Sequence, residues 1–113
     1  MSAILTTDSE ITEAIAQWLD AQGDSPTDAW NAVTVARFDY GDGTRGSIRW
    51  QSEQRHVDFE TDRTLGPWFI YTLRTATHTM SLMFTPEFFR DSAEPIVPLL
   101  HKQASEELHQ SAH

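Results

Sequence analysis

Four residues with acid–base or metal-binding side chains alternate along one short segment: His56, Asp58, Glu60 and Asp62. Alternate residues of a β-strand point to the same face, so these side chains would form one row. Such a row could bind a hard cation, or supply a general acid and a general base. The alternative is a solvated row paired with arginines on the next strand. We favour this alternative because charged faces are common in antiparallel sheets that are buried on one side only.

Residues 41–46 have the sequence Gly-Asp-Gly-Thr-Arg-Gly, a literal match to the dinucleotide-binding pattern Gly-x-Gly-x-x-Gly. In that pattern a helix must begin directly after the glycines, because its N-terminus receives the pyrophosphate. Residues 47–50 instead alternate polar and apolar side chains, as a strand does. The segment therefore predicts a hairpin turn and no nucleotide cofactor.

A third pattern near the C-terminus places Glu106 three residues before His109, with His113 four residues further on. Di-iron helical bundles use such a Glu-x-x-His pair twice, together with two more glutamates on other helices. The chain has one such pair. We therefore expect a solvated terminal helix here and predict no metal site.

No other set of residues indicates a catalytic mechanism. A Ser-His-Asp triad is recognised by geometry, and the spacing of serine and histidine in this chain does not single one out. The absence of cysteine excludes a thiol nucleophile, thiolate metal ligands and disulfides. We predict no catalytic residue, no cofactor and no enzymatic activity. A small enzyme with an unrecognised pocket is kept as an alternative.

The elements that carry these residues begin with an N-terminal helix. Thr7 and Glu10 have the spacing of a capping box. In this motif the side chain of each residue accepts a hydrogen bond from the backbone N–H of the other. Apolar residues then recur at helical spacing and predict one buried stripe: Ile11, Ile15, Trp18 and Leu19. Gly23 is expected to end this helix, because glycine is common directly after a helix C-terminus.

The middle of the chain predicts a five-stranded antiparallel β-meander, starting with strands at 33–40, 44–52 and 55–61. A three-residue loop at 41–43, with Gly43 left-handed, would pair Ala36 with Ile48 and Asp39 with Arg45. A two-residue turn at 53–54 would then form the next hairpin. Its pairs would be Trp50–Val57, Ile48–Phe59, Arg49–Asp58, Ser47–Glu60 and Arg45–Asp62. In this register the central arginines are neutralised by acids across the sheet.

The last two strands are predicted at 68–75 and 78–85, with a turn at residues 76–77. The inward pairs of this hairpin would be Phe69–Phe84, Tyr71–Leu82 and Leu73–Met80. The opposite face of the hairpin is also apolar at one end, where Trp68, Ile70 and Met83 lie. Such a patch must be covered by another element or by a partner.

Two helices are expected to close the chain. Thr85 would cap a short helix whose first residue is Pro86, and a final helix from about 94 to 110 carries an apolar stripe. We expect that helix over the Trp68 end of the second sheet face, or along an edge. The prediction is one α+β domain over residues 1–113, a two-layer sandwich with frayed ends at about 1–6 and 110–113.

Acidic residues are unevenly distributed. Residues 1–31 hold six acids and no lysine or arginine, and the whole chain has a formal charge of −9. Because nucleic-acid affinity comes largely from basic residues, direct DNA or RNA binding is not expected. Acids early in the first helix are stabilised by the helix dipole, whose positive end is at the N-terminus. No such local reason applies to Asp20, Asp24 and Asp28.

The favoured function is therefore a small acidic protein, of the immunity type, that inhibits or neutralises a basic protein partner such as a toxin or a nucleic-acid-handling enzyme. Asp20, Asp24 and Asp28 are its candidate partner-binding acids. Alternatively, Trp68, Ile70 and Met83 bind a second copy, as a homodimer, or a client in a chaperone-like docking module. No apolar stretch approaches the ~20 residues of a membrane span, and no signal peptide is evident, so a cytoplasmic location is expected.

Overall fold

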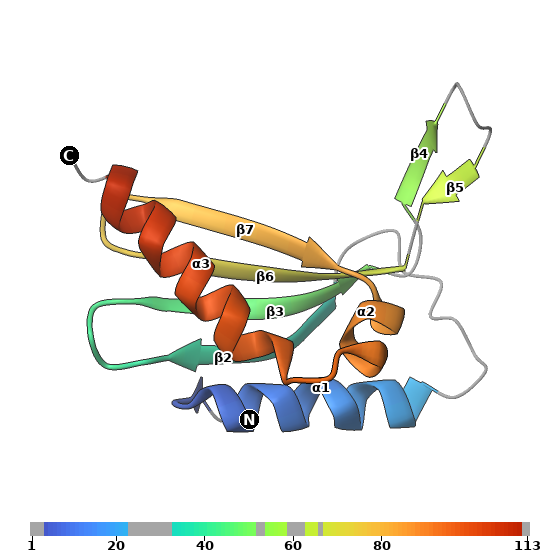
Figure 1. The fold of residues 1–113 in the computed structure, drawn as a ribbon, viewed down its shortest axis with the longest axis horizontal. Coiled ribbons are helices and arrows are strands. Elements are labelled where there is room, and N and C mark those ends of the chain that lie inside the picture. Colours follow the sequence, from blue (N-terminus) through green and yellow to red (C-terminus); the bar gives the residue numbers. More distant parts are fainter. Residues whose placement is uncertain (1–3, 23–32, 52–53, 59–62, 66, 112–113) are drawn as a thin grey trace.

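The structure is a computed structural model that describes residues 4–22, 33–51, 54–58, 63–65 and 67–111 (Figure 1). Its elements in chain order are β1 (Ile4–Leu5), α1 (Asp8–Gln22), β2 (Val33–Asp39), β3 (Arg45–Gln51), β4 (Gln54–Asp58), β5 (Arg63–Leu65), β6 (Trp68–Arg74), β7 (Thr79–Phe84), α2 (Pro86–Asp91) and α3 (Ile96–Ser111).

Five strands form the main sheet in the order β1-β2-β3-β6-β7. The pairs β2–β3, β3–β6 and β6–β7 are antiparallel, whereas β1 runs parallel to β2. The sequence did not predict the short strand β1. With α1 and α3 as a second layer, the structure confirms the predicted α+β class, although the sheet is mixed rather than wholly antiparallel.

The first turn of α1 confirms the predicted capping box. The Thr7 hydroxyl accepts a hydrogen bond from the backbone N–H of Glu10 at 3.3 Å. The Glu10 carboxylate in turn accepts from the hydroxyls of Thr6 and Thr7, and from the backbone N–H of Thr6. These bonds, led by the one from the Thr6 hydroxyl, hold the pKa of Glu10 below its ordinary value. They stabilise the helix start because N-terminal N–H groups lack partners within the helix.

The first hairpin, β2–β3, has the predicted register. Ala36 lies opposite Ile48 and Asp39 opposite Arg45. Gly41 and Gly43 have φ angles of 79° and 95°, a conformation that side chains disfavour. The glycine-rich segment is thus a turn followed by a strand, as expected, and it lacks the helix that a nucleotide site requires.

The predicted second hairpin is wrong. Strand β3 pairs with β6, so that Trp50 faces Phe69 and Ile48 faces Tyr71. Strand β4 pairs with β5 in a separate two-stranded sheet that projects from the main layers (Figure 1). The physical reason is burial, because Phe69, Tyr71 and Leu73 are completely buried in the core. Apolar burial stabilises by about 25 cal/mol per Å², so β6 outcompetes the nearer segment.

The last hairpin and the short helix confirm the prediction. The inward pairs of β6 and β7 are Phe69–Phe84, Tyr71–Leu82 and Leu73–Met80. The Thr85 hydroxyl accepts the backbone N–H of Phe88 and caps α2, with Pro86 at its first position.

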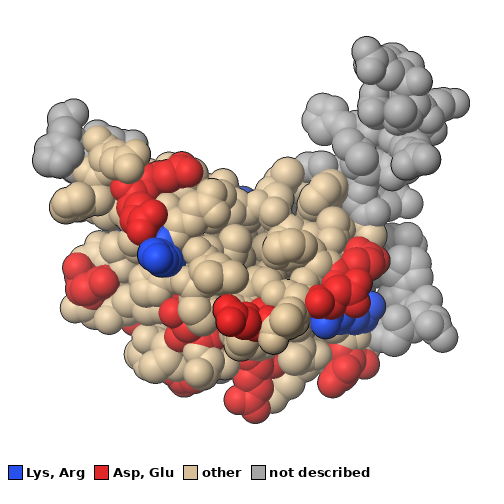
Figure 2. Space-filling model, in the orientation of Figure 1, with Lys and Arg blue, Asp and Glu red and all other residues tan. Residues whose placement is uncertain are grey.

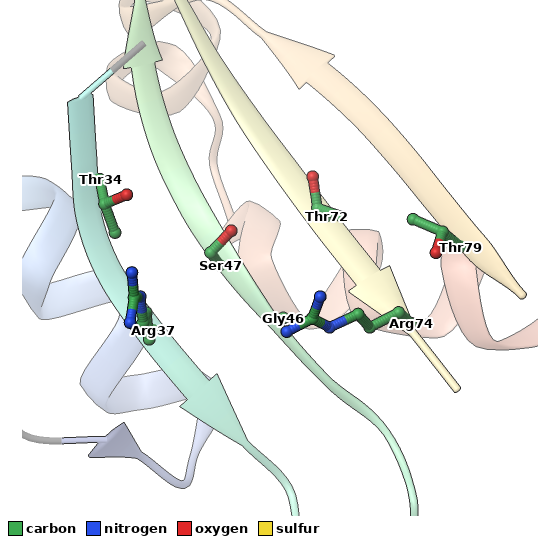
Figure 3. Close-up of a pocket in the computed structure, with 7 residues that line it drawn as sticks. All are labelled: Thr34, Arg37, Gly46, Ser47, Thr72, Arg74 and Thr79. Carbon is green, nitrogen blue, oxygen red and sulfur yellow. The ribbon is translucent and has the colours of Figure 1, made fainter. Parts of the chain in front are cut away.

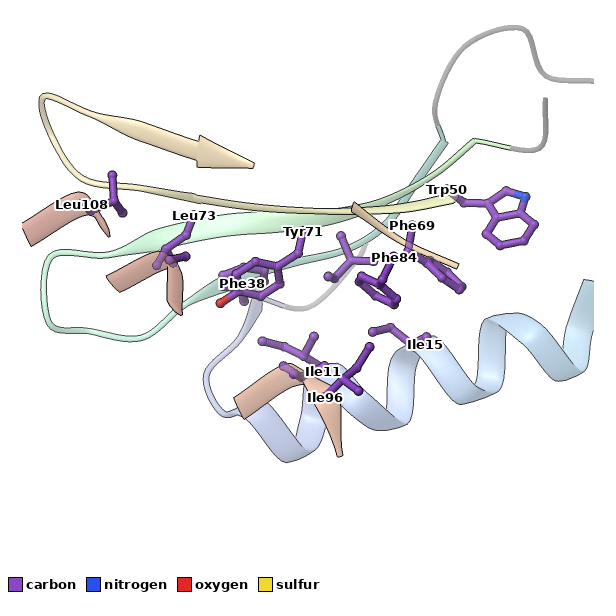
Figure 4. Close-up of a cluster of buried hydrophobic side chains, with 13 residues drawn as sticks. Ile11, Ile15, Phe38, Trp50, Phe69, Tyr71, Leu73, Phe84, Ile96 and Leu108 are labelled. Carbon is purple, nitrogen blue, oxygen red and sulfur yellow. The ribbon is translucent and has the colours of Figure 1, made fainter. Parts of the chain in front are cut away.

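Helix α3 lies on the same face of the sheet as α1, and our expectation of the other face or an edge is wrong. One buried cluster joins Ile11 and Ile15 of α1 to Val97 and Ala104 of α3 and to Tyr71 of the sheet (Figure 4). A single helix is too narrow to cover the inward residues of β2, β3, β6 and β7, so α3 completes the layer. The second face of the sheet is consequently left without a described helix over it.

Candidate functional site

Four of the six predicted partner-binding residues are described by the structure, and they occupy different parts of the molecule. Asp20 is exposed on the outer side of α1. Asp24 and Asp28 lie outside the described residues. Trp68, Ile70 and Met83 are close together on the sheet face away from the helices.

The apolar patch is partly open. Ile70 lies directly opposite Met83 across β6 and β7. Trp68 is half-buried and Ile70 is 9% exposed, whereas Met83 is 51% exposed. Because α3 packs on the other face, it does not cover Met83. The predicted covering of this patch by the C-terminal helix is therefore wrong.

The second sheet face also carries the arginines of the main sheet. One row across the strands is Arg37, Ser47, Thr72 and Ser81, and the next is Asp39, Arg45, Arg74 and Thr79. Arg45 thus faces Arg74, and Arg49 faces Ile70. The predicted pairs Arg49–Asp58, Ser47–Glu60 and Arg45–Asp62 are therefore wrong, because β3 pairs with β6 at these positions.

Of the alternating row, His56 and Asp58 lie on β4 of the small hairpin. Asp58 ends β4 opposite Arg63 of β5. Glu60 and Asp62 lie outside the described residues, so the structure does not test whether the four side chains share one face. At the C-terminus, Glu106 and His109 lie on α3. No group of three or more metal-ligating side chains occurs within the described ranges.

Charge is divided between the two layers. The helices hold eight acids against Arg90 and Lys102, a net charge of −6. The main sheet holds four arginines against Asp39, a net charge of +3. Figure 2 shows the acids spread over the face seen there, with few basic residues among them. The described helices are therefore negative and the main sheet is positive, a division that the total charge of −9 does not reveal.

A polar cluster joins the two layers at the start of α1. The Tyr40 hydroxyl donates to the Asp8 carboxylate at 2.6 Å and lies 3.0 Å from the Tyr71 hydroxyl. His101 of α3 contacts the other Asp8 oxygen at 3.2 Å. Burial raises the pKa of Tyr40 above its ordinary value, and the bond to Asp8 raises it further. Burial also raises the pKa of Tyr71.

Both tyrosines are therefore neutral at ordinary pH, and the cluster connects α1, β6 and α3 to the residue that follows β2. The sequence offered no signal for it, because 32 residues separate Tyr40 from Asp8 and 93 separate His101 from Asp8. The arginine face did leave a signal. Arg45, Ser47 and Arg49 alternate along one strand. The predicted partner of Arg45 on β2, Asp39, is correct, whereas the partners predicted on the other side of β3 are wrong.

Searches with the sequence and the fold found no protein family, no curated protein and no solved structure that matches the chain. None of the helices in the described part of the chain is long and apolar enough to cross a membrane.

Proposed function

We propose that this protein is a non-enzymatic binding protein that uses its acidic helix layer to dock on a basic protein and to inhibit or neutralise it. The observation that carries the proposal is the division of charge between the layers. Acids of α1, α2 and α3 outnumber bases by eight to two, while the sheet is net positive. A concentrated single-sign field accelerates the capture of an oppositely charged surface.

Exposure of the acids supports the same proposal. Glu13 and Asp20 are exposed on α1, and Glu106 is exposed on α3. Asp20 lies near the C-terminus of its helix, where a negative charge opposes the helix dipole. With no local stabilising role, it is free to serve recognition. Asp24 and Asp28 follow it in the sequence and lie outside the described residues.

The test compares two variants of equal net charge. Glu13→Gln/Asp20→Asn removes two negative charges from the helix layer. Thr79→Lys/Ser81→Lys changes the net charge by the same amount, but on the opposite sheet face, where both residues are exposed. Basic proteins from the native host are captured on immobilised wild type, identified, and measured as purified partners against each variant.

The proposal requires the helix variant to slow association several-fold at low salt while the sheet variant stays close to wild type. Melting temperatures of both variants are measured to show that folding is intact. If the two variants weaken binding equally, net charge alone is responsible. If neither does, the helix layer is not the binding surface.

A second candidate function is a homo-oligomerising or chaperone-like docking module. It is favoured by Met83, which is 51% exposed beside Ile70 on a face that no described helix covers. Sedimentation of wild type and Met83→Asp distinguishes the cases. A wild-type dimer that the variant dissociates supports this candidate, whereas a monomer in both samples at all concentrations eliminates self-association.

A further inference from the structure

A concavity of about 390 Å³ lies on the open face of the main sheet. Arg37 of β2 and Arg74 of β6 line it from two sides, and the Arg74 side chain extends across β3 (Figure 3). Between and around the two guanidinium groups are four hydroxyls, those of Thr34, Ser47, Thr72 and Thr79. The lining contains no acidic side chain, although the protein as a whole is strongly acidic.

The two arginines of the concavity are not neutralised by the described part of the chain. Within it, the ion pair that the structure shows is between Asp8 and His101, in the other layer. Arg74 instead lies directly opposite Arg45 across β3 and β6. Like charges facing each other on adjacent strands destabilise a sheet. Pairing with Arg45, which already faces Asp39 on its other side, therefore gives Arg74 no stabilising role in the sheet, whereas a binding role accounts for its position.

Guanidinium groups and hydroxyls together suit one ligand chemistry. The planar fork of arginine matches the oxygens of a carboxylate or a phosphate, and it is weakly hydrated, so it loses little on binding. Serine and threonine hydroxyls supply further donors. The volume is at the small end of the range for small-molecule sites, which begins at about 300 Å³.

We propose that this concavity binds a small molecule bearing two oxyanion groups, which bridges Arg37 and Arg74 and accepts hydrogen bonds from the hydroxyls around them. The acidic helix layer does not prevent this, because salt screens charges beyond a Debye length of about 8 Å at physiological ionic strength. The site is on the opposite face from the proposed protein-docking surface. The proposal of an anion site is therefore independent of the proposed function.

The experiment is a titration of the full chain, labelled with ¹⁵N, at constant ionic strength. Pyrophosphate and succinate serve as probes, one for phosphate and one for carboxylate chemistry. Saturable chemical-shift changes are expected at the backbone amides of Ser47 and Thr72. Saturation with pyrophosphate alone, with succinate alone or with both supports the site and identifies its chemistry.

Three variants establish which residues are responsible. Arg37→Gln and Arg74→Gln should each weaken binding by about tenfold, since each removes a charge-assisted contact. Arg90→Gln, which removes an exposed arginine from α2 with the same change in charge, should leave binding unchanged. Arg37→Lys and Arg74→Lys retain the charge, lose the planar fork and should bind with intermediate affinity, which provides a second readout if a glutamine variant folds poorly.

Two results would overturn the proposal. The first is a linear response without saturation for both probes in the wild type, which indicates a general ionic effect. The second is an equal loss of affinity in Arg90→Gln and in the variants of the concavity, which assigns the response to net charge.

Discussion

Tyr40 and His101 stack face to face, with ring centroids 3.8 Å apart and ring planes within 4° of parallel. Both side chains also contact the carboxylate of Asp8, the first residue of α1. These contacts therefore join the residue that follows β2, the start of α1 and the middle of α3. Because a helix layer and a sheet meet here, we expect the cluster to contribute to stability disproportionately for its size.

Tyr40→Phe tests the hydroxyl of this cluster separately from its ring. The variant retains the stack on His101 but loses the hydrogen bonds to Asp8 and Tyr71. A hydrogen bond to a charged group contributes roughly 1.5–3 kcal/mol, and we expect a loss of that order in the free energy of unfolding, measured in urea. Thr77→Ala, which removes an exposed hydroxyl from the β6–β7 turn, should cost under about 0.5 kcal/mol. Equal effects would contradict the cluster's role.

Stability should fall as the solution becomes alkaline. Burial raises the pKa of both Tyr40 and Tyr71 in the folded protein. An unfolded tyrosine loses its proton near pH 10, while the folded one keeps it, so the unfolded state gains relative stability above about pH 10. The contribution of these phenols is thus complete below about pH 10 and is lost above it.

Denaturation measured between about pH 8 and pH 11 checks this dependence. The chain has two tyrosines and a single lysine, so few other groups titrate in that range. Tyr40→Phe should show a shallower decline than wild type. A variant whose decline is as steep as that of wild type would show that another group is responsible.

Gly46 should tolerate no side chain. A Cβ placed there would lie 1.8 Å from the carbonyl oxygen of Thr72 and 2.9 Å from the Phe38 ring. Since the obstacle is backbone, β3 and β6 would have to separate, and we expect Gly46→Ala to cost about 3 kcal/mol or more. Gly41→Ala is the control, because a Cβ there meets nothing within 4 Å and costs only the strain of a positive φ, about 1–2 kcal/mol. Thermal unfolding ranks the two, and the reverse order would be inconsistent with the close strand approach.

Arg74→Gln should stabilise the protein while it weakens anion binding. The substitution removes the like charge that faces Arg45 across the sheet, which is expected to gain about 0.2–1 kcal/mol at low salt. The gain should shrink in high salt, where exposed charges are screened. Arg90→Gln provides the control and should have little effect. A loss of stability in Arg74→Gln at low salt would mean that the arginine has a structural role after all.

The elements that formed as predicted are those decided by neighbouring residues. The capping box of α1, the Thr85 cap of α2 and the turns at 41–43 and 76–77 depend on side chains within a few positions of one another. Local hydrogen bonds and backbone preferences determine such features, and the residues responsible for both can be read from the sequence. For the same reason the buried stripe of α1 was evident from spacing alone.

The choice of partner across the sheet was decided by the tertiary structure. Residues 55–61 are nearer to β3 in the chain, yet β6 offers three completely buried side chains and takes its place. The same competition for burial brought α3 to the face already occupied by α1. Local spacing carries no information about which of two distant apolar surfaces buries more area.

The acidic helix layer and the arginine-bearing sheet face both result from the competition between segments for apolar burial. The sequence by itself determined that Arg45 and Arg49 share one strand face, and that acids dominate the helices at both ends of the chain. Tertiary pairing alone placed Arg74 opposite Arg45 and left that face without a described helix over it. Strand alternation is a local property, whereas the neighbour that a strand acquires depends on the free energy of the whole core.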